Sequence, residues 1–139
     1  MGLVALRFSQ YTIAETNLKQ ALDILAKTFG PEHVSVGVVE ASLAEVYLSE
    51  RDYSKAESFI RGALEKERSS LGDASFEVAK SFLIAAQIAE KQNRSSEAES
   101  DYRKAVSLYG TTIGADHPEA LHAQELYSRF AKKIHRTDP

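Results

Sequence analysis

A short turn containing one glycine returns every 42 residues and constrains this chain more than any other feature. It reads FGPEH at residues 29–33, LGDAS at residues 71–75 and IGADH at residues 113–117. In each copy an apolar residue precedes the glycine. Self-similarity at a fixed period of this length is typical of repeat arrays, in which each unit packs on its neighbours. We therefore expect a series of repeated helical hairpins.

The segment before each turn has the residue spacing of an amphipathic helix. Two alanine positions recur at the repeat period, with one large apolar residue between them. Because the spacing is four residues and then three, these side chains share one helical face. Small residues on that face let a neighbouring helix approach closely. The residues are Ala14, Leu18 and Ala21, then Ala56, Ile60 and Ala63, then Ala98, Tyr102 and Ala105.

Helices of a second type are expected between these segments. Apolar residues from Val36 to Tyr47 and from Phe82 to Ala89 follow a spacing of three and four. The β-branched run at residues 34–39 is the one strand-like stretch, and the repeat alignment assigns it to a helix. The expected helices span residues 2–8 (half a helix), 11–28, 34–49, 53–70, 75–91, 95–111 and 117–135. They form a single array over residues 1–139, with a partial repeat at 1–29, full repeats at 30–71 and 72–113, and a capping helix at 114–135.

The turn residues support these boundaries. Glycine closes a helix in the left-handed conformation without a steric penalty, which suits Gly30, Gly72 and Gly114. Asn93 tolerates the same conformation between paired helices. Arg51, at the matching position, does not, so we expect another geometry in that turn. Asp116 and Glu119 have the spacing of a capping box for the last helix.

Composition excludes several functional classes. The chain has no cysteine, which excludes disulfides, thiolate metal sites and cysteine nucleophiles. Its formal net charge of −3 gives no general reason to expect nucleic acid or a membrane surface as a partner. The sequence has no apolar run of the roughly 20 residues that span a bilayer and no signal-peptide pattern at its start. We therefore expect a cytoplasmic protein.

No group of residues indicates catalysis, so we expect no enzyme, no cofactor and no metal site. The recurring Glu15, Glu57 and Glu99 are held apart by the repeat, and a role at helix starts or in packing explains them. His117 and His122 are five residues apart and do not share a helical face for a metal. A structural role in the turns is expected for His33 and His117.

These residues together resemble the tetratricopeptide repeat family, in the 42-residue version found in kinesin light chains. The opening of that repeat matches Gly30-Pro31-Glu32-His33 and, most faithfully, Gly114 with Asp116-His117-Pro118. Its later positions match Leu43-Ala44, Tyr47, Tyr53, Ala56-Glu57 and Ala63-Leu64. The resemblance covers nearly the whole chain.

The resemblance implies a right-handed superhelix of antiparallel helix pairs, a tetratricopeptide solenoid, with a concave groove that binds peptides or protein segments. Kinesin light chain-like repeats carry an Asn-Asn pair in the first helix of each hairpin, and one of these amides holds the ligand backbone. The matching pairs here are Ala41-Ser42, Leu83-Ile84 and Glu125-Leu126, which contain no amide. Backbone clamping of an extended peptide is therefore not expected.

The groove should carry an apolar floor flanked by cations, which would suit an acidic and apolar partner segment. In the alternative interpretation the apolar residues fill the interior and the lysines form a solvated face. The predicted groove residues are Lys80, Leu83, Ile84, Gln87, Lys91, His122, Leu126, Arg129 and Lys133.

The first hairpin should leave an apolar side uncovered through Leu18, Leu22 and Leu25. Because repeat arrays need polar caps, we expect either a fragment of a longer protein or pairing with another copy of the chain. The leading functional hypothesis is a non-catalytic protein-interaction module. The alternative is a structural or self-associating array whose groove is empty or filled by its own chain. The sequence does not identify the partner, the host protein or the oligomeric state.

Overall fold

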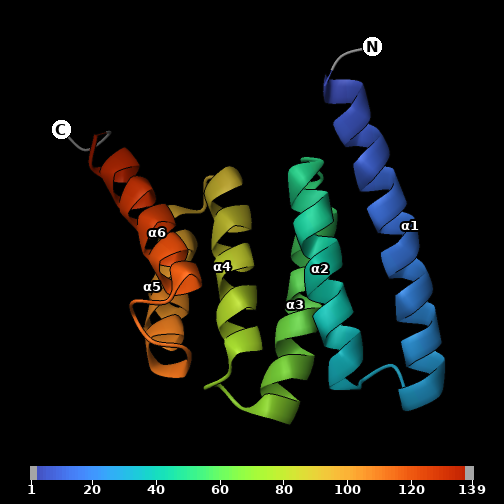
Figure 1. The fold of residues 1–139 in the computed structure, drawn as a ribbon. Coiled ribbons are helices and arrows are strands. Elements are labelled where there is room, and N and C mark those ends of the chain that lie inside the picture. The colour runs from blue at the N-terminus through green and yellow to red at the C-terminus, as the bar shows by residue number, and fades with distance from the viewer. Residues whose placement is uncertain (1–2, 137–139) are drawn as a thin grey trace. The chain divides into compact units, whose positions relative to one another are not determined.

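The computed structural model describes the backbone of residues 3–136 and the side chains of residues 9–135. In these residues the chain forms six helices and no strand (Figure 1). They are α1 (Leu3–Phe29), α2 (Val34–Ser49), α3 (Tyr53–Leu71), α4 (Phe76–Lys91), α5 (Ser95–Thr112) and α6 (Pro118–Arg136). We refer to α2, α4 and α6 as A-type helices and to α1, α3 and α5 as B-type helices.

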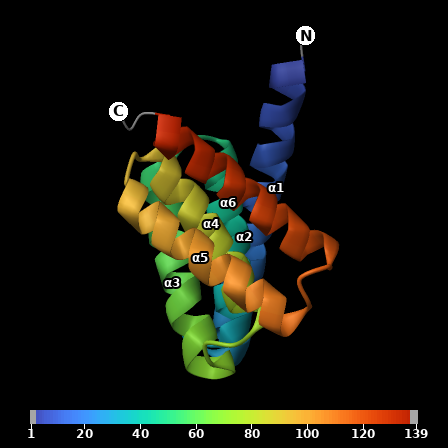
Figure 2. The same ribbon diagram turned by 90° about the vertical axis from the view of Figure 1, so that its left-hand side faces the viewer.

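The helices group into two compact units, Met1–Ser70 and Leu71–Pro139. The boundary falls within one residue of the boundary expected between the two full repeats. Within the second unit, α4, α5 and α6 lie side by side in both views (Figures 1 and 2). The arrangement of all repeats in a single array stays a prediction.

Two glycines determine how closely α2 and α3 pack in the first unit. A Cβ atom on Gly37 would lie 3.0 Å from Lys66 Cβ and 3.3 Å from the Ala63 carbonyl oxygen. A Cβ atom on Gly62 would lie 2.6 Å from a carboxylate oxygen of Glu40. The absence of these two side chains therefore leaves room for the Glu40–Lys66 ion pair, whose N···O distance is 2.8 Å.

The second unit is built around α5. Its tyrosine Tyr102 is 1% exposed and packs against Phe130 and Tyr127 of α6, with ring centroids 5.2 and 5.9 Å away. Tyr109 is 2% exposed and meets Phe76 of α4 edge to face. Aromatic side chains thus fill the space on both sides of this B-type helix.

The predicted small-large-small face of the B-type helices is confirmed for α3 and α5. All four alanines are fully buried, and the large residues between them are at most 2% exposed. Alanine at these positions lets an A-type helix pack closely, as the sequence predicted. The residues are Ala56, Ile60, Ala63, Ala98, Tyr102 and Ala105.

The A-type helices begin at caps that follow the repeat period. His33 Nδ1 accepts the Ser35 amide hydrogen at 3.1 Å, Ser75 Oγ accepts that of Val78 at 3.2 Å, and His117 Nδ1 accepts that of Glu119 at 3.2 Å. Each side chain satisfies a backbone N–H that has no partner within the helix. The turn role predicted for the two histidines is confirmed.

The predicted capping box of Asp116 and Glu119 is wrong. Helix α6 begins at Pro118, so the residue before the helix is His117 and its imidazole makes the capping contact. Proline is favoured at the first helical position because its missing N–H would have no partner there. This preference moves the helix start one residue beyond the expected one.

The predicted break between residues 8 and 11 is also wrong, because α1 continues without interruption from Leu3 to Phe29. Ser9 and Gln10 occupy the positions of Arg51 and Asp52 in the next copy, where a turn joins α2 to α3. A turn there would leave backbone groups at two helix ends without partners, whereas a continuous helix pairs them. Met1 and Gly2, part of the expected half helix, lie outside the described residues.

Positive φ angles close every helix that precedes a turn glycine, at 96° for Gly30, 78° for Gly72 and 94° for Gly114. Asn93 has a φ of 61°, as predicted. Arg51 has a φ of 66°, so the different geometry expected for its turn is wrong. Both turns make the same three backbone hydrogen bonds, donated by residues 50, 51 and 52 in one and by residues 92, 93 and 94 in the other. Repeat packing thus imposes the left-handed conformation on arginine despite its side chain.

Candidate functional site

The predicted groove residues of α4 divide into exposed and buried sets. Lys80 and Lys91 are exposed and Gln87 is half-buried. The spacing of seven and four residues places these three on one face of the helix. Leu83 and Ile84 are only 7% and 2% exposed, so they belong to the interior. The expectation that they form an apolar floor open to a partner is therefore not met, and the alternative interpretation holds for these two residues.

The predicted residues of α6 also share one helical face. His122, Arg129 and Lys133 are exposed, and Leu126 is half-buried between them. Arg129 pairs with Glu125 one turn earlier, at an N···O distance of 2.5 Å. This helix therefore presents cations around one partly accessible leucine. We call the α4 residues Lys80, Gln87 and Lys91 together with the α6 residues His122, Leu126, Arg129 and Lys133 the basic face.

Glu90 connects the two helices that carry the basic face. Lys133 Nζ of α6 lies 3.7 Å from Glu90 Oε2 of α4. The hydroxyl of Tyr102 in α5 donates a 2.6 Å hydrogen bond to the other carboxylate oxygen. Burial, and then this hydrogen bond, raise the pKa of Tyr102, so the phenol stays protonated and remains a donor. The hydrogen bond from Tyr102 thus fixes the position of the Glu90 carboxylate, and its ion pair with Lys133 keeps that lysine beside α4.

Two cations of the basic face remain available to a partner. Within the part of the chain that the structure describes, neither Lys80 nor Lys91 forms an ion pair. They lie eleven residues apart on α4, which corresponds to about 16 Å along the helix axis. Arg129 and Lys133, in contrast, already have carboxylate neighbours. An incoming acidic group would therefore find its least compensated charges on α4.

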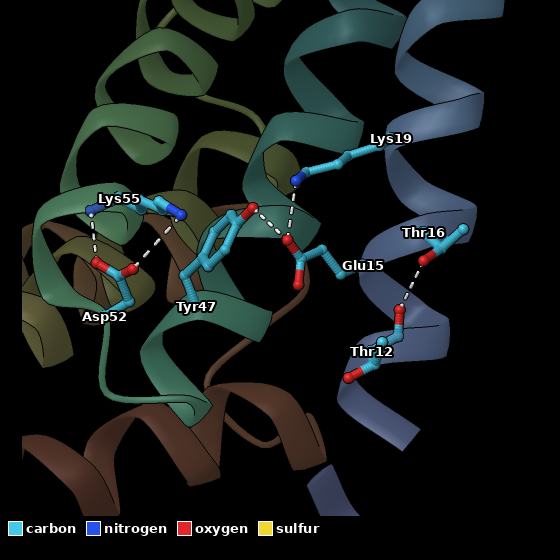
Figure 3. Close-up of polar contacts among 7 residues, drawn as sticks. All are labelled: Thr12, Glu15, Thr16, Lys19, Tyr47, Asp52 and Lys55. Atoms are coloured by element: carbon cyan, nitrogen blue, oxygen red, sulfur yellow. Dashed lines mark hydrogen bonds and ion pairs between the residues drawn. The ribbon is translucent and has the colours of Figure 1, made fainter. Parts of the chain in front are cut away.

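A second polar cluster lies between α1, α2 and the start of α3 (Figure 3). The Tyr47 hydroxyl donates a 2.8 Å hydrogen bond to Glu15 Oε1, and Lys19 Nζ lies 2.9 Å from the same oxygen. Lys55 Nζ stands 5.4 Å from the centre of the Tyr47 ring. Lys19 and Tyr47 lower the pKa of Glu15, whereas burial and the bond to Glu15 raise that of Tyr47. These groups already satisfy one another, so the cluster joins helices rather than receiving a ligand.

The recurring glutamates have a partner that the sequence analysis missed. In each B-type helix a cation follows the glutamate by four residues and pairs with it on the helix surface. The pairs are Glu15–Lys19, Glu57–Arg61 and Glu99–Arg103, with N···O distances of 2.9, 2.6 and 2.9 Å. Alignment of positions 19, 61 and 103 at the repeat period would have shown them. Repetition of the pair in all three copies indicates a structural role.

Asp101 is a second residue that sequence reasoning missed. It is half-buried on α5, and burial raises the pKa of its carboxyl group to about 6. Glu97 adds to this increase and Lys104 opposes it. At the same repeat position the previous copy has Phe59, which stacks on Tyr47 with a centroid distance of 5.5 Å. A carboxylate thus occupies a position that is suited to an aromatic ring.

No group of three or more histidine or carboxylate side chains in the described residues could hold a metal ion. No helix among the described residues is both long and apolar enough to cross a membrane.

The comparisons with known proteins identify the family. Two family models, each described as a tetratricopeptide repeat, match residues 1–66 and 79–119. The chain belongs to the tetratricopeptide repeat family. Members of this family generally mediate protein–protein interaction or scaffolding, bind proteins or peptides, and are typically non-catalytic. No curated protein gave a match in a direct sequence comparison.

A solved structure agrees with this assignment. The crystal structure of BtubC (BKLC) from P. vanneervenii matches 94% of this chain with a TM-score of 0.70 and 17% sequence identity. The match shows that this chain shares the fold of that protein. The predicted all-α fold of antiparallel helix pairs is therefore confirmed. This chain spans 56% of the length of that protein.

Proposed function

We propose that this chain is a non-catalytic interaction module that binds an acidic segment of a partner protein along the basic face. The observation that carries the proposal is the pair of exposed lysines on α4, Lys80 and Lys91, which have no ion-pair partner in the described residues. They occur in a chain whose formal net charge is −3, so this local excess of positive charge runs against the overall balance. Complementary charge favours specific encounter with an acidic segment.

The spacing of the lysines defines the partner more closely. An extended peptide advances about 3.3 Å per residue and turns alternate side chains to the same face. Two acidic residues four or six positions apart, about 13 or 20 Å, can therefore both face α4 and approach Lys80 and Lys91, which are roughly 16 Å apart. His122 and Lys133 are likewise eleven residues apart, on α6. An apolar residue in the middle of the segment would meet Leu126, the partly accessible leucine of this face. The proposed ligand is therefore a short extended segment with an acidic residue at each end and an apolar centre.

The mode of binding follows from what this face lacks. Positions 83, 84, 125 and 126 hold Leu, Ile, Glu and Leu, so no amide is present where kinesin light chain-like repeats carry the Asn-Asn pair. Affinity would then depend on side-chain charge more than on hydrogen bonds to the ligand backbone. Exposed charge pairs are screened by salt, so the proposed binding weakens as ionic strength increases. In keeping with the composition, we propose a cytoplasmic setting and assign no nucleic acid, membrane or cofactor to the module.

Charge reversal on α4 tests the proposal. Peptides would be selected from a random library on the purified chain, and their affinities would be measured by fluorescence anisotropy. The double variant Lys80→Glu/Lys91→Glu should bind a selected acidic peptide about tenfold more weakly, because two exposed charge pairs of up to about 1 kcal/mol each are lost.

The control is Lys132→Glu. It can be combined with Lys27→Glu, so that two lysines are reversed as in the Lys80→Glu/Lys91→Glu variant. Lys132 is exposed on α6 but does not belong to the basic face. This control should retain the affinity for the selected peptide. Equal affinities for wild type, double variant and control would show that the basic face is not the binding surface.

A structural role is the second candidate function, and a different observation favours it. The large apolar side chains Ile13 and Ile24 of α1 are 58% and 61% exposed. Every described side chain of α1 stays at least partly accessible. This helix offers a surface for assembly that lies in the first unit, whereas the basic face belongs to the second.

A further inference from the structure

The uncovered side of α1 corresponds to a side that is covered in both other B-type helices. In α3, the side chain of Lys66 is only 13% exposed because it pairs with Glu40 of α2, the A-type helix that precedes it. The position 42 residues earlier is Ile24, which is 61% exposed. The position 42 residues later is Leu108, which is half-buried. This position therefore contacts the preceding A-type helix in α3 and is partly covered in α5, but it is open in α1.

Neighbouring positions on the same side of α1 agree. Ala63 and Ala105 are fully buried, whereas Ala21 at the same repeat position is only partly buried. Glu67 and Tyr109 are 1% and 2% exposed, whereas Leu25 is partly exposed. In the other copies, the preceding A-type helix contacts this side through Gly37 and Phe76. Because this side of α3 and α5 packs against a helix, a helix is also the expected partner for the same side of α1.

The charges of α1 lie away from this side. From residue 9 to residue 28 the charged residues are Glu15, Lys19, Asp23 and Lys27, which form two pairs at 2.9 and 3.0 Å. A separate row with alternating spacings of four and three carries no charge and is continuous along one face. We call it the α1 seam; its residues are Gln10, Ala14, Asn17, Ala21, Ile24 and Thr28. Absence of charge is a property of interface cores rather than of ordinary exposed helix faces.

We propose that the α1 seam pairs with the same seam of a second copy of this chain, with the two helices antiparallel. A two-fold axis near residue 19 then places Ala14 opposite the partner's Ile24 and Asn17 opposite the partner's Ala21. Gln10 lies opposite the partner's Thr28, two polar side chains that can hydrogen-bond to each other. Each layer combines a smaller and a larger residue, so the helices approach closely without a clash. This self-complementarity selects a second copy over an unrelated helix.

The polarity and the small size of the α1 seam indicate how strong the pairing is. Three of its six residues are polar, and one helix on each side supplies a contact much smaller than the 800 Å² per partner of a standard interface. We therefore expect a weak, concentration-dependent dimer. This assembly is independent of the basic face, because the seam lies wholly in the first unit.

Sedimentation equilibrium over a wide range of protein concentrations tests the pairing. The wild-type chain should shift from monomer to dimer as concentration increases. Ile24→Glu should remain monomeric, because each copy would place one charged carboxylate in the interface. Leu121→Glu, which changes a 51% exposed leucine of α6 in the same way, should dimerise like wild type. A monomeric wild type, or a dimer that survives Ile24→Glu, would overturn the proposal.

Cysteine cross-linking tests the orientation against a background without native thiols. An oxidised mixture of Ala14→Cys and Ile24→Cys chains should give the mixed disulfide, because these positions face each other in the antiparallel pair. Each variant oxidised alone should give little dimer, since the two copies of one position lie about 15 Å apart along the axis, beyond disulfide reach. Preferential cross-linking of each variant to itself would indicate parallel helices and reject the arrangement. Circular dichroism would confirm that both variants keep the wild-type helix content.

Discussion

Arg51 shows at the level of one residue how the repeat overrides local preference. Its φ of 66° is unfavourable for a residue with a Cβ atom, yet the turn makes the same three backbone hydrogen bonds as the turn at Asn93. The left-handed conformation costs roughly 1–2 kcal/mol for residues other than glycine and, to a smaller extent, asparagine. Arginine is therefore a strained residue that the packing of the paired helices holds in place.

Replacing Arg51 by glycine should stabilise the chain. The variant removes the steric cost of the positive φ but increases the flexibility of the unfolded chain, so the expected net gain is about 0.5–1 kcal/mol. Urea unfolding followed by circular dichroism would measure it. Asn93→Gly is the matched control and should gain less, because asparagine already tolerates this conformation. Equal gains at both positions would contradict the strain assigned to Arg51.

Asp101 should make stability depend on pH. Its pKa is about 6 in the folded chain and near 3.8 when unfolded, so the folded state binds the proton more tightly. Stability should therefore increase as pH falls from 7 towards 4, and the charged carboxylate should be unfavourable at neutral pH.

Asp101→Asn should accordingly raise the free energy of unfolding by about 1–2 kcal/mol at pH 7, allowing for partial solvent screening. At pH 4 the gain should largely disappear, because the wild-type carboxyl group is then protonated in the folded state. Urea unfolding at the two pH values measures the difference. A gain of the same size at both would show that burial of the charge is not the cause.

At the scale of helices, the close approach of α2 and α3 depends on Gly37. A methyl group there would lie 3.0 Å from Lys66 Cβ, so Gly37→Ala should destabilise the first unit by about 1 kcal/mol despite the better helix propensity of alanine. Gly110→Ala in α5 is the control. No atom lies within 4 Å of its added Cβ, so this variant should gain about 0.5–1 kcal/mol. Thermal unfolding would separate the two; stabilisation by both variants would contradict the tight contact.

The helices illustrate what the sequence can and cannot predict. The limits of α2 match the expected ones, because a turn glycine and a capping side chain mark its start. The continuity of α1 was not predictable from the repeat alignment, because the alignment transfers the turn at Arg51 and Asp52 to Ser9 and Gln10. The small-large-small face was predictable because close packing requires alanine at fixed positions.

The candidate site was only partly predictable. Spacing alone placed Lys80, Gln87 and Lys91 on one helical face, of which the two lysines are exposed, but it could not show that Leu83 and Ile84 are buried. Their burial depends on the neighbours that surround α4, and a helical pattern says little about those when nearly all sides of a helix are apolar. Ion pairs between helices, such as Glu90–Lys133, were missed for the same reason.

At the scale of the whole molecule, the family and the fold are established. The proposal of an acidic partner segment depends on the positive charge of the basic face. Tetratricopeptide repeats host many interactions on one architecture, so the partner must be inferred from the surface of this particular chain. The two proposed surfaces lie in different units, with the α1 seam in the first and the basic face in the second. Each can therefore be tested without disturbing the other.

Chemical-shift mapping of a selected acidic peptide on the isotopically labelled chain tests directly whether the basic face binds the partner. The largest amide shifts should fall on α4 around Lys80, Gln87 and Lys91 and on the Leu126 side of α6, while α1 should be unaffected. Added salt should reverse these shifts. Shifts confined to the first unit, or binding that does not depend on salt, would contradict the assignment of the basic face as the partner-binding surface.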